Sequence, residues 1–547
     1  MAMPQLSGQP ILILKEGATR TRGREAQRAN IMAARIVSEA LKTSLGPRGM
    51  DKMLVDSIGE VTVTNDGATV LKEIAVEHPA AKMMVEVAKT QDQEVGDGTT
   101  TAVVIAGELL SRAQALMEKG VHPTILVDGF TVACEMARSY LDEIAVRVKP
   151  TDRRILTKVA EAAMATKTLA GEKDMLAEIA AEAVLAVADK KGDKYIVDID
   201  DVKVEKKAGG SLSDTRLVKG IVVDKEIVHA RMPKRVEKAK IAMIIKPFEI
   251  EKPEFDSKLS IENPEQLEAF ISREEKLLEE MVEKLASTGA NVLFCQRGID
   301  DAAQYYMAKR GILATRRVKV ADMERLAKAT GGKVVTEVDH IQESDLGYAD
   351  VVEEVKVGKD RMLFVEGCKN PRSVTIMVRG GNERMVYEAE RAIHDAICVV
   401  RDVVQEPRIV AGGGAPEAEV ARRLRDYARK TPGRLQLPIL AFAEALESIP
   451  MILAENAGLD PIDVLVEMRA RHDKGEVWSG IDPVKGKVVD MYKIGIYEPL
   501  SVKRQALLSA TEAANMIIRI DDLIAVGKSK SEAPSKGSEE GAGEEES

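Results

Sequence analysis

Aromatic residues make up only 3% of this 547-residue chain, which has a single tryptophan. Because bases stack on aromatic rings, this scarcity argues against a nucleic-acid surface. The charges agree with this, because 79 basic and 89 acidic residues give a net charge of −10 and the two signs are interspersed. No basic groove is indicated, so we expect no nucleic-acid partner.

Cysteine is also scarce. Cys134, Cys295, Cys368 and Cys398 lie far apart and form no Cys-x-x-Cys pair, which argues against a zinc motif and a disulfide framework. Unpaired thiols fit a reducing compartment, and we expect the protein in the cytoplasm. The sequence has no signal-peptide pattern and no long uncharged apolar run, so we expect no membrane partner.

The most informative stretch that is present is GDGTT, residues 96–100. Helical periodicity runs into it over 80–88 and out of it over 99–119, so Gly98 lies at the start of a helix. There, unpaired N–H groups and the helix dipole favour an anion, glycine lets the backbone approach it, and threonine hydroxyls add donors. The pattern predicts a phosphate site.

Asp97 lies inside this stretch and cannot itself favour a phosphate. Its carboxylate can instead hold a divalent cation that phosphate oxygens share, an arrangement that Mg²⁺ prefers. The alternative is a simple helix cap, since aspartate and threonine are good caps. The GxGxxG dinucleotide fingerprint does not fit, because Thr101 occupies the position of its third glycine. A Walker A loop ending at Ser529 does not fit either, because Asp522 occupies the position of its first glycine.

Other glycine-containing turns are spread along the chain. One at 45–49 follows a helical pattern over 24–43, and one at 65–69 follows the alternating strand 61–64. Taken singly, each is typical of an ordinary turn. A third, at 411–417, introduces a helix whose first turn holds proline and glutamate, so it is a second place where backbone can crowd a ligand.

Six motifs, taken together in their order and spacing, resemble the group II chaperonins over essentially the whole chain, and archaeal thermosome subunits most closely. They are LGPRGMDKM (45–53), TNDGAT (64–69), GDGTT (96–100), ERAIHDAI (390–397), AGGGAPE (411–417) and VVDMYKIGIYEPLSVK (488–503). The resemblance implies a multidomain α+β and α/β fold. Its parts are a mostly helical equatorial ATPase domain, a small intermediate hinge domain and an α/β apical domain with a helical protrusion.

Turn-rich stretches at 208–213 and 367–371 suit hinges on either side of the middle of the chain. Together with the resemblance, these hinges predict three domains. The equatorial domain is 1–149 and 405–527, the intermediate domain is 150–218 and 370–404, and the apical domain with a built-in lid is 219–369. The tail at 528–547 is predicted to be disordered.

The resemblance also assigns roles to single residues. Asp66 and Asp395 would position and deprotonate the water that attacks ATP, and Asp97 would hold Mg²⁺. Asp395 lies in the middle of a predicted helix, where the alternative interpretation is a solvent-exposed acid. The resemblance implies that this helix swings down over the nucleotide, so hydrolysis would require closure of the domains. The nucleotide-binding residues would be Leu45, Gly46, Pro47, Asp97, Gly98, Thr99, Thr100 and Thr101, with Gly413 and Glu498 at the nucleoside and Gly480 near the base.

One departure from the family pattern is visible. Members commonly carry a Gly-Lys pair in a nucleotide-sensing loop of the hinge domain, whereas here Glu172 follows Gly171. Either Lys167 or Lys173 is left to take that role.

The middle of the chain has a different texture. Short apolar strands at 241–245, 291–295, 311–315 and 334–335 alternate with helical runs such as 272–287, which predicts an α/β domain.

Its unusual segment, 246–261, alternates apolar and charged residues. The alternation fits an edge segment packed on its own domain. The resemblance implies instead a lid that offers exposed apolar side chains to non-native polypeptides or to neighbouring lids. Those side chains would be Phe248, Ile250, Phe255, Leu259 and Ile261.

We therefore expect an ATP-driven folding chaperone, assembled with other subunits in a double ring that encloses its client. One alternative is a soluble small-molecule kinase or ATPase of low oligomeric order. Another is a passive ring scaffold that has lost hydrolysis, against which the three acids Asp66, Asp97 and Asp395 argue.

Overall fold

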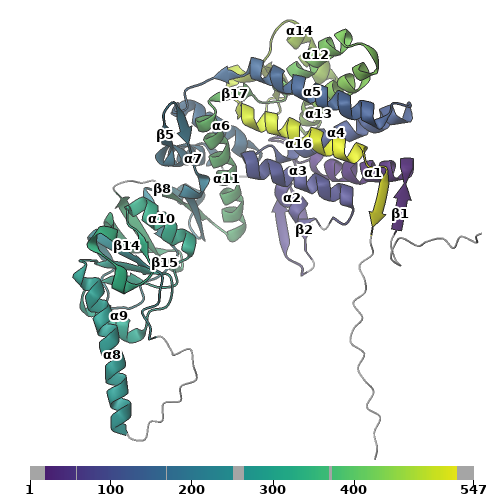
Figure 1. Ribbon diagram of the computed structural model, residues 1–547. Helices are drawn as coiled ribbons and strands as arrows, with labels where there is room; N and C mark the ends of the chain where they lie inside the picture. The colour runs from purple at the N-terminus through teal and green to yellow at the C-terminus, as the bar shows by residue number, and fades with distance from the viewer. Residues whose placement is uncertain are drawn as a thin grey trace, which may run out of the picture.

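The computed structural model describes residues 19–56, 58–74, 76–167, 169, 171–250, 264–368 and 373–525. The described chain has three packed regions in a row (Figure 1). A helical region lies at one end, a region built on a large sheet lies at the other, and a smaller mixed region joins them. The order in space differs from the order in sequence, because both ends of the described chain enter the helical region.

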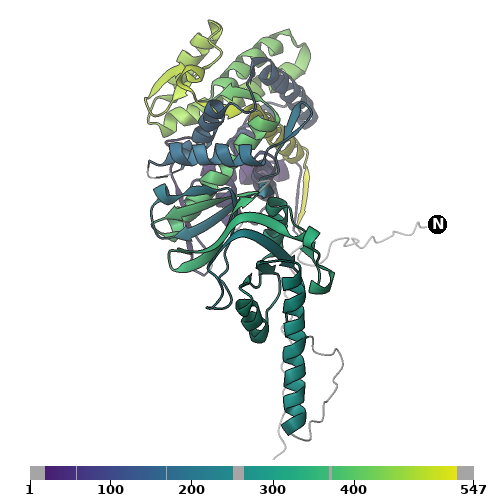
Figure 2. The ribbon, with the colours of Figure 1, turned by 90° about the vertical axis from the view of Figure 1, so that its left-hand side faces the viewer.

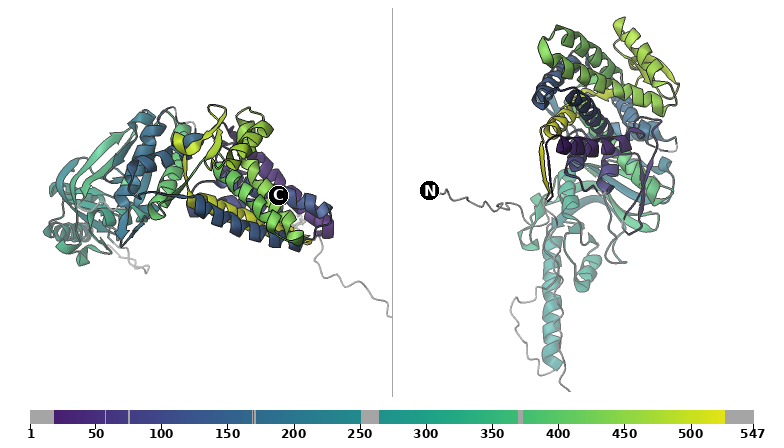
Figure 3. Two further views of the ribbon diagram at one scale, coloured as in Figure 1. Left: turned by 90° about the horizontal axis from the view of Figure 1, so that it is seen from above. Right: turned by 90° about the vertical axis from the view of Figure 1, so that its right-hand side faces the viewer.

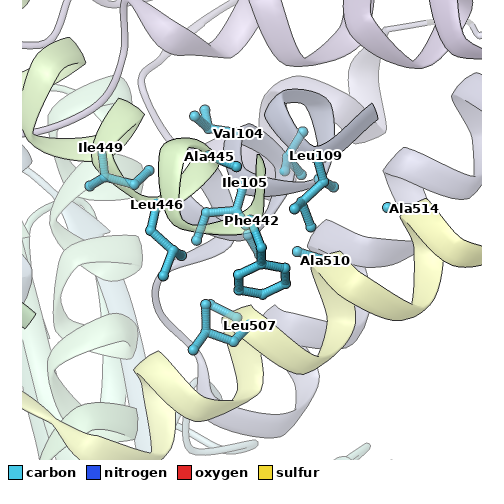
Figure 4. Packing of buried hydrophobic residues seen from close by; sticks show 14 of the residues in the cluster. Val104, Ile105, Leu109, Phe442, Ala445, Leu446, Ile449, Leu507, Ala510 and Ala514 are labelled. Carbon is cyan, nitrogen blue, oxygen red and sulfur yellow. The ribbon is translucent and has the colours of Figure 1, made fainter. Parts of the chain in front are cut away.

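The helical region is packed around α4, α13 and α16. Their facing sides carry several alanines, among them Ala445, Ala510 and Ala514, which lets the helices approach closely around Phe442 (Figure 4). The ring of Phe130 on α5 packs against that of Phe442, with ring centroids 6.0 Å apart. The helices of this region are α1 (Gly23–Lys42), α2 (Gly67–Glu73), α3 (Pro79–Val95), α4 (Thr99–Glu118), α5 (Pro123–Ile144), α12 (Ala415–Lys430), α13 (Gln436–Asn456), α14 (Pro461–Asp473), α15 (Met491–Ile494) and α16 (Leu500–Ile518).

Two sequence predictions are confirmed here. The helix predicted over 24–43 is α1, and the helix predicted over 99–119 is α4. Among the described residues, one helical stretch, Gly433–Asn456, is long and apolar enough to cross a membrane, but 78% of its apolar window is buried inside the structure. Such burial is typical of a core helix.

Short strands complete this region. β1 and β21, from the two ends of the described chain, pair antiparallel (Figure 3). The strand predicted at 61–64 is confirmed as β3. The strands are β1 (Thr19–Arg22) with β21 (Asp522–Ala525), β2 (Lys52–Val55) with β3 (Val61–Thr64), β18 (Ser479–Asp482) with β19 (Lys487–Asp490), and β4 (Val146–Arg147), β17 (Arg408–Ala411) and β20 (Tyr497–Pro499) in one sheet.

The middle region joins segments that lie on either side of the large sheet in the sequence. Its core lies between helices α6, α7 and α11 and a three-stranded sheet of order β7-β16-β8. Its elements are α6 (Arg153–Ala163), α7 (Lys173–Val187), α11 (Glu383–Gln405), β5 (Asp189–Lys191), β6 (Lys194–Ile196), β7 (Val202–Ala208), β8 (Arg216–Val218) and β16 (Val374–Gly380).

The third region has a seven-stranded sheet of order β12-β11-β10-β14-β15-β9, with β13 beside β10, and a separate hydrophobic core on each face. The strands predicted at 241–245, 291–295, 311–315 and 334–335 are all present. The elements are β9 (Gly220–Val223), β10 (Arg235–Ile244), α8 (Pro264–Ser287), β11 (Val292–Cys295), α9 (Asp301–Lys309), β12 (Leu313–Thr315), α10 (Val320–Thr330), β13 (Val334–Val335), β14 (Gly347–Val357) and β15 (Asp360–Cys368).

Helix α8 projects well beyond this sheet, away from the other two regions (Figure 2). The segment before α8 contains Phe248, which was predicted to be exposed on a lid. Its side chain is instead fully buried in the core that contains Ile299. The Phe248 N–H donates to the carbonyl of Gly298 at 3.0 Å, and its own carbonyl accepts from the Asp300 N–H at 2.9 Å.

These two hydrogen bonds dock the segment on its own domain and turn the ring of Phe248 inward. Ile250 is half-buried against the same core. The expectation of an exposed, client-binding Phe248 is therefore wrong. Phe255, Leu259, Ile261 and the tail at 528–547 lie outside the described residues.

Candidate functional site

A cavity of about 460 Å³ lies between the helical region and the middle region. Its walls come from turns and helix starts that are far apart in the sequence. Of the predicted catalytic and nucleotide-binding residues, the cavity brings together Leu45, Gly46, Pro47, Asp66, Asp97, Gly98, Thr99, Thr100, Thr101, Asp395, Gly413 and Glu498.

The first wall is the start of α4. Gly98 is its N-cap residue with φ +76°, a left-handed conformation that favours glycine, and a Cβ atom there would lie 2.9 Å from Cγ1 of Val502. Among the described residues no side chain caps this helix, so the helix-cap alternative for Asp97 is wrong. The first N–H groups of α4 are therefore left for a ligand in the cavity.

A second glycine turn follows α1. Gly46 has φ +82°, and a Cβ atom on it would lie 2.3 Å from Cδ2 of Leu453 on α13. The Nδ2 group of Asn456 donates to the carbonyls of Lys42 and Leu45, each at 2.9 Å. These bonds hold the turn at the end of α1 against α13, with Gly46 and Pro47 facing the cavity.

The third wall is the β18–β19 hairpin, which supplies residues 481–485. Its backbone is bonded to the turn before α12, since the Ile481 N–H donates to the carbonyl of Gly413 at 2.9 Å. Gly413 has φ +67°, and a Cβ atom on it would lie 2.5 Å from the Ile481 carbonyl oxygen. Only glycine permits this close approach of the two walls.

Asp66 is the N-cap residue of α2. Its Oδ2 atom accepts hydrogen bonds from the N–H of Thr69 at 2.9 Å and from the Thr69 hydroxyl at 2.7 Å. Burial alone would raise the pKa of Asp66, but the charge of Lys167 and the two Thr69 bonds hold that pKa below its usual value. Asp66 is therefore an ionised, fixed carboxylate at the cavity edge.

Asp395 projects from α11, which belongs to the middle region. Its side chain is only 15% exposed, so the solvated-acid alternative is wrong. Its Oδ2 atom lies 3.6 Å from Nζ of Lys167. Burial raises the pKa of Asp395 well above its usual value, and although Lys167 opposes this shift, the nearby charge of Asp66 adds to it.

Asp97 is enclosed between these two acids and the start of α4. Its Oδ1 atom accepts from the Gly98 N–H at 2.6 Å. Burial raises the pKa of Asp97, against the effects of the Gly98 bond and of the Lys167 charge. Asp97 is only partly exposed to solvent, and a bound cation would stabilise its ionised form.

Lys167 supplies the positive charge that faces these acids. It is 4% exposed, and although burial lowers its pKa, the charges of Asp395 and Asp66 outweigh burial and leave the pKa above its usual value. Lys173 lies elsewhere, where its ammonium group donates to the carbonyl of Ala165 at 3.2 Å. Of the two lysines left open by the sequence, the structure places Lys167 in the cavity.

Comparison with known proteins gives one family over nearly the whole chain. The model of the TCP-1/cpn60 chaperonin family matches residues 37–528. The chain belongs to this chaperonin family. Its similarity to thermosome subunits over the full length supports an ATP-dependent group II chaperonin function.

Three similar relatives illustrate the match. A thermosome subunit of Methanopyrus kandleri is 58% identical over 525 residues, which cover 96% of each chain. One of Pyrococcus horikoshii is 56% identical over 544 residues, covering 100% of this chain and 98% of the relative. The thermosome subunit alpha of Archaeoglobus fulgidus is 54% identical over 545 residues, covering 100% of both.

One predicted site residue of this chaperonin does not line the cavity. Gly480 lies behind the wall, where a Cβ atom would meet the carbonyl oxygens of Gly413 at 2.9 Å and Gly412 at 3.0 Å. Glycine at this position permits the close contact between the two walls. The resemblance placed Gly480 near the base, but its neighbour Ile481 is the residue that lines the cavity.

The chaperonin cavity also contains polar residues that sequence reasoning missed. Lys503 is 7% exposed, and its Nζ atom lies 2.8 Å from Oε1 of Glu417 and 2.7 Å from Oε2 of Glu498. Burial lowers the pKa of Lys503, but these two carboxylates raise it further, so the lysine is charged. Glu417 and Lys503 stand inside two of the six motifs, and that position was the signal that could have found them.

Asn65 was also missed, although it stands next to Asp66 in the second motif. Its amide nitrogen donates to the carbonyl of Thr166, while its buried Oδ1 atom has no hydrogen-bond partner among the described residues. An unpaired buried acceptor on a cavity wall costs free energy, which a ligand donor or cation would recover.

The described residues contain no group of three or more His, Cys, Asp or Glu side chains arranged to hold a metal ion. A cation at Asp97 would therefore have at most two such side chains as ligands and would need further oxygen ligands. Mg²⁺ suits such a site, since it is commonly bound by one or two carboxylates together with phosphate oxygens and water.

Proposed function

We propose that the cavity binds ATP with Mg²⁺ and hydrolyses the nucleotide. The observation that carries this proposal is the convergence of Asp66, Asp97, Asp395 and Lys167 on the bare N-terminus of α4, contributed by two separately packed regions. Phosphoryl transfer needs mainly positioning and neutralisation of charge, and this arrangement supplies both.

The binding roles follow from the walls. The phosphates lie over the turn at Gly46 and Pro47 and accept hydrogen bonds from the first N–H groups and hydroxyls of α4, the helix that begins at Thr99. The nucleoside lies toward Gly413 and Glu498, and Lys503 holds Glu498 in place. Mg²⁺, held by Asp97, would neutralise the phosphate charge.

The water-activating pair is Asp66 and Asp395. Asp66 orients the attacking water as a fixed, ionised acceptor. Asp395 takes its proton, a role that suits a carboxyl whose pKa burial has raised well above its usual value. Because Asp395 belongs to the middle region, a movement of that region over the helical one completes the site, so hydrolysis is coupled to closure.

The three packed regions support the domain bounds expected above. The helical region is the equatorial domain (1–149 and 405–527), the middle region is the intermediate domain (150–218 and 370–404), and the sheet region is the apical domain (219–369). The protein acts in the cytoplasm on non-native polypeptides, enclosed in a double ring with other chaperonin subunits.

The size of the native particle tests this proposal against the small-molecule kinase alternative. We expect native mass measurement of the purified protein to give a double ring of subunits, and ATP with Mg²⁺ to be hydrolysed without any added phosphate acceptor. A monomer or dimer that consumes ATP only when a small-molecule acceptor is present would favour the kinase.

A further prediction concerns the lid segment, which lies outside the described residues. Replacing 251–261 with a short linker should leave particle size and ATPase activity unchanged but abolish protection of a bound client from protease after ATP is added. The reason is that the lid and the cavity belong to different regions of the chain. A matched control exchanges Glu251 and Lys258 for serine and keeps the apolar residues of the segment. Protection that survives the deletion would contradict a lid.

A further inference from the structure

A buried ionic cluster lies outside the cavity, on the far side of its hairpin wall. Its centre is His472 at the end of α14, 1% exposed, which faces Glu419 of α12, 0% exposed. The imidazole Nδ1 atom lies 3.0 Å from Oε2 of Glu419, and Nε2 lies 2.8 Å from the carbonyl oxygen of Ser479 on β18. None of the roles proposed above uses this cluster.

Both neighbours of the ring are hydrogen-bond acceptors. Burial would raise the pKa of Glu419, but hydrogen bonds from His472, Arg422 and Arg423 lower it to about 2, so this carboxylate is ionised. The Ser479 carbonyl can only accept. Each ring nitrogen of His472 thus lies within hydrogen-bond distance of an acceptor oxygen. His472 therefore bridges Glu419 and the Ser479 carbonyl through its two ring nitrogens.

The bond to Ser479 anchors the strand that forms the cavity wall. Ser479 lies two residues before Ile481, whose N–H is bonded to Gly413 at 2.9 Å. Glu419 lies in the second turn of α12, the helix that begins directly after Gly413 and Gly414. The Glu419–His472–Ser479 chain therefore ties the hairpin wall to the same helix that carries the opposite wall.

We propose that His472 is a positioning residue for the nucleotide, holding the 481–485 wall at its distance from Gly413. This inference rests on the proposed function, because it requires that the cavity bind ATP. His472 contacts neither the cavity acids Asp66, Asp97 and Asp395 nor the start of α4. Its loss therefore lowers nucleotide affinity and leaves the chemical step intact.

Two amide substitutions separate the two hydrogen bonds. In His472→Gln the amide nitrogen takes the place of Nε2 and can still donate to Ser479. In His472→Asn the shorter amide takes the place of Nδ1, reaches Glu419 only and leaves the Ser479 carbonyl unpaired. His340→Asn, at an exposed histidine of the apical region, is the matched control.

The experiment measures the Kd of assembled particles for ATP with Mg²⁺, together with kcat at saturating ATP. We expect His472→Asn to raise Kd about 5- to 20-fold, because the buried Ser479 carbonyl loses its hydrogen-bond donor. The glutamine and His340→Asn variants should stay within about twofold of wild type, with kcat of all variants within about twofold.

Equal Kd values for the asparagine variant and wild type overturn the positioning role, as does a loss of affinity that is equal in the two amide variants. A fall in kcat with unchanged Kd also overturns it. If the asparagine variant fails to assemble, the glutamine variant decides alone, and an assembled glutamine particle with Kd raised more than about fivefold contradicts the anchor. A wild-type particle that binds no ATP overturns both this inference and the proposed function.

Discussion

Replacement of Asp395 with alanine is expected to lower kcat for ATP hydrolysis by about 10²- to 10⁴-fold, the usual contribution of a positioned general base. ATP should still bind, because the phosphate-facing helix start and Asp97 are untouched. Removing one of the five acids that line the cavity also lessens repulsion of the phosphates, so Kd for ATP should be unchanged or lower. Single-turnover hydrolysis and equilibrium binding, measured on assembled particles, separate the two effects.

A control on the same helix is Glu383→Ala, which removes an exposed acid from the first turn of α11. It should leave both binding and turnover at the wild-type level. If Asp395→Ala lowers affinity and kcat together, the acid positions the nucleotide rather than the water. If neither changes, the base lies elsewhere.

The second large effect is expected for Asp97→Ala. This variant should lose about 10²- to 10³-fold in kcat/KM for ATP, because the phosphate charge loses its bridging cation in a partly enclosed site. Wild-type hydrolysis should stop when EDTA removes Mg²⁺ and return when the ion is added. The alanine variant should show little response to added Mg²⁺ over the range that saturates wild type.

Asp97→Asn refines the same test. The amide keeps an oxygen that can accept the Gly98 N–H bond of 2.6 Å but has no charge for the cation. Activity as low as that of the alanine variant would assign the effect to the metal, whereas activity near wild type would assign it to the hydrogen bond. Full ATPase activity in the alanine variant would contradict a metal site at Asp97.

Local elements could be predicted from the sequence because each depends on a short stretch of chain. The strand at 61–64 follows from strict alternation, and the start of α4 follows from a glycine pair placed before a long apolar period. Asp66 was expected in the site through the family resemblance, and the structure adds that it caps α2.

Neither the sequence pattern nor the family resemblance could decide whether the side chain of Phe248 is exposed or buried. Its alternating neighbours fit an exposed lid or a docked edge equally well, and the bridge to the segment at Ile299, distant in the chain, decides between them. Burying a phenylalanine on its own domain is favourable by about 1.5–3 kcal/mol, so the ring turns inward where a core lies within reach.

The order of the motifs and the glycines that let backbone approach a ligand are properties of the sequence alone, since they depend on residue type and spacing. Which lysine faces the acids is a property of the tertiary structure. Lys167 and Lys173 lie in one short stretch, but only packing of α11 against α6 brings Asp395 beside Lys167. The same holds for Lys503 with Glu417 and for His472 with Glu419. Their hydrogen bonds join segments whose approach is set by the hydrophobic core, and a buried charge takes the partner that the core places beside it.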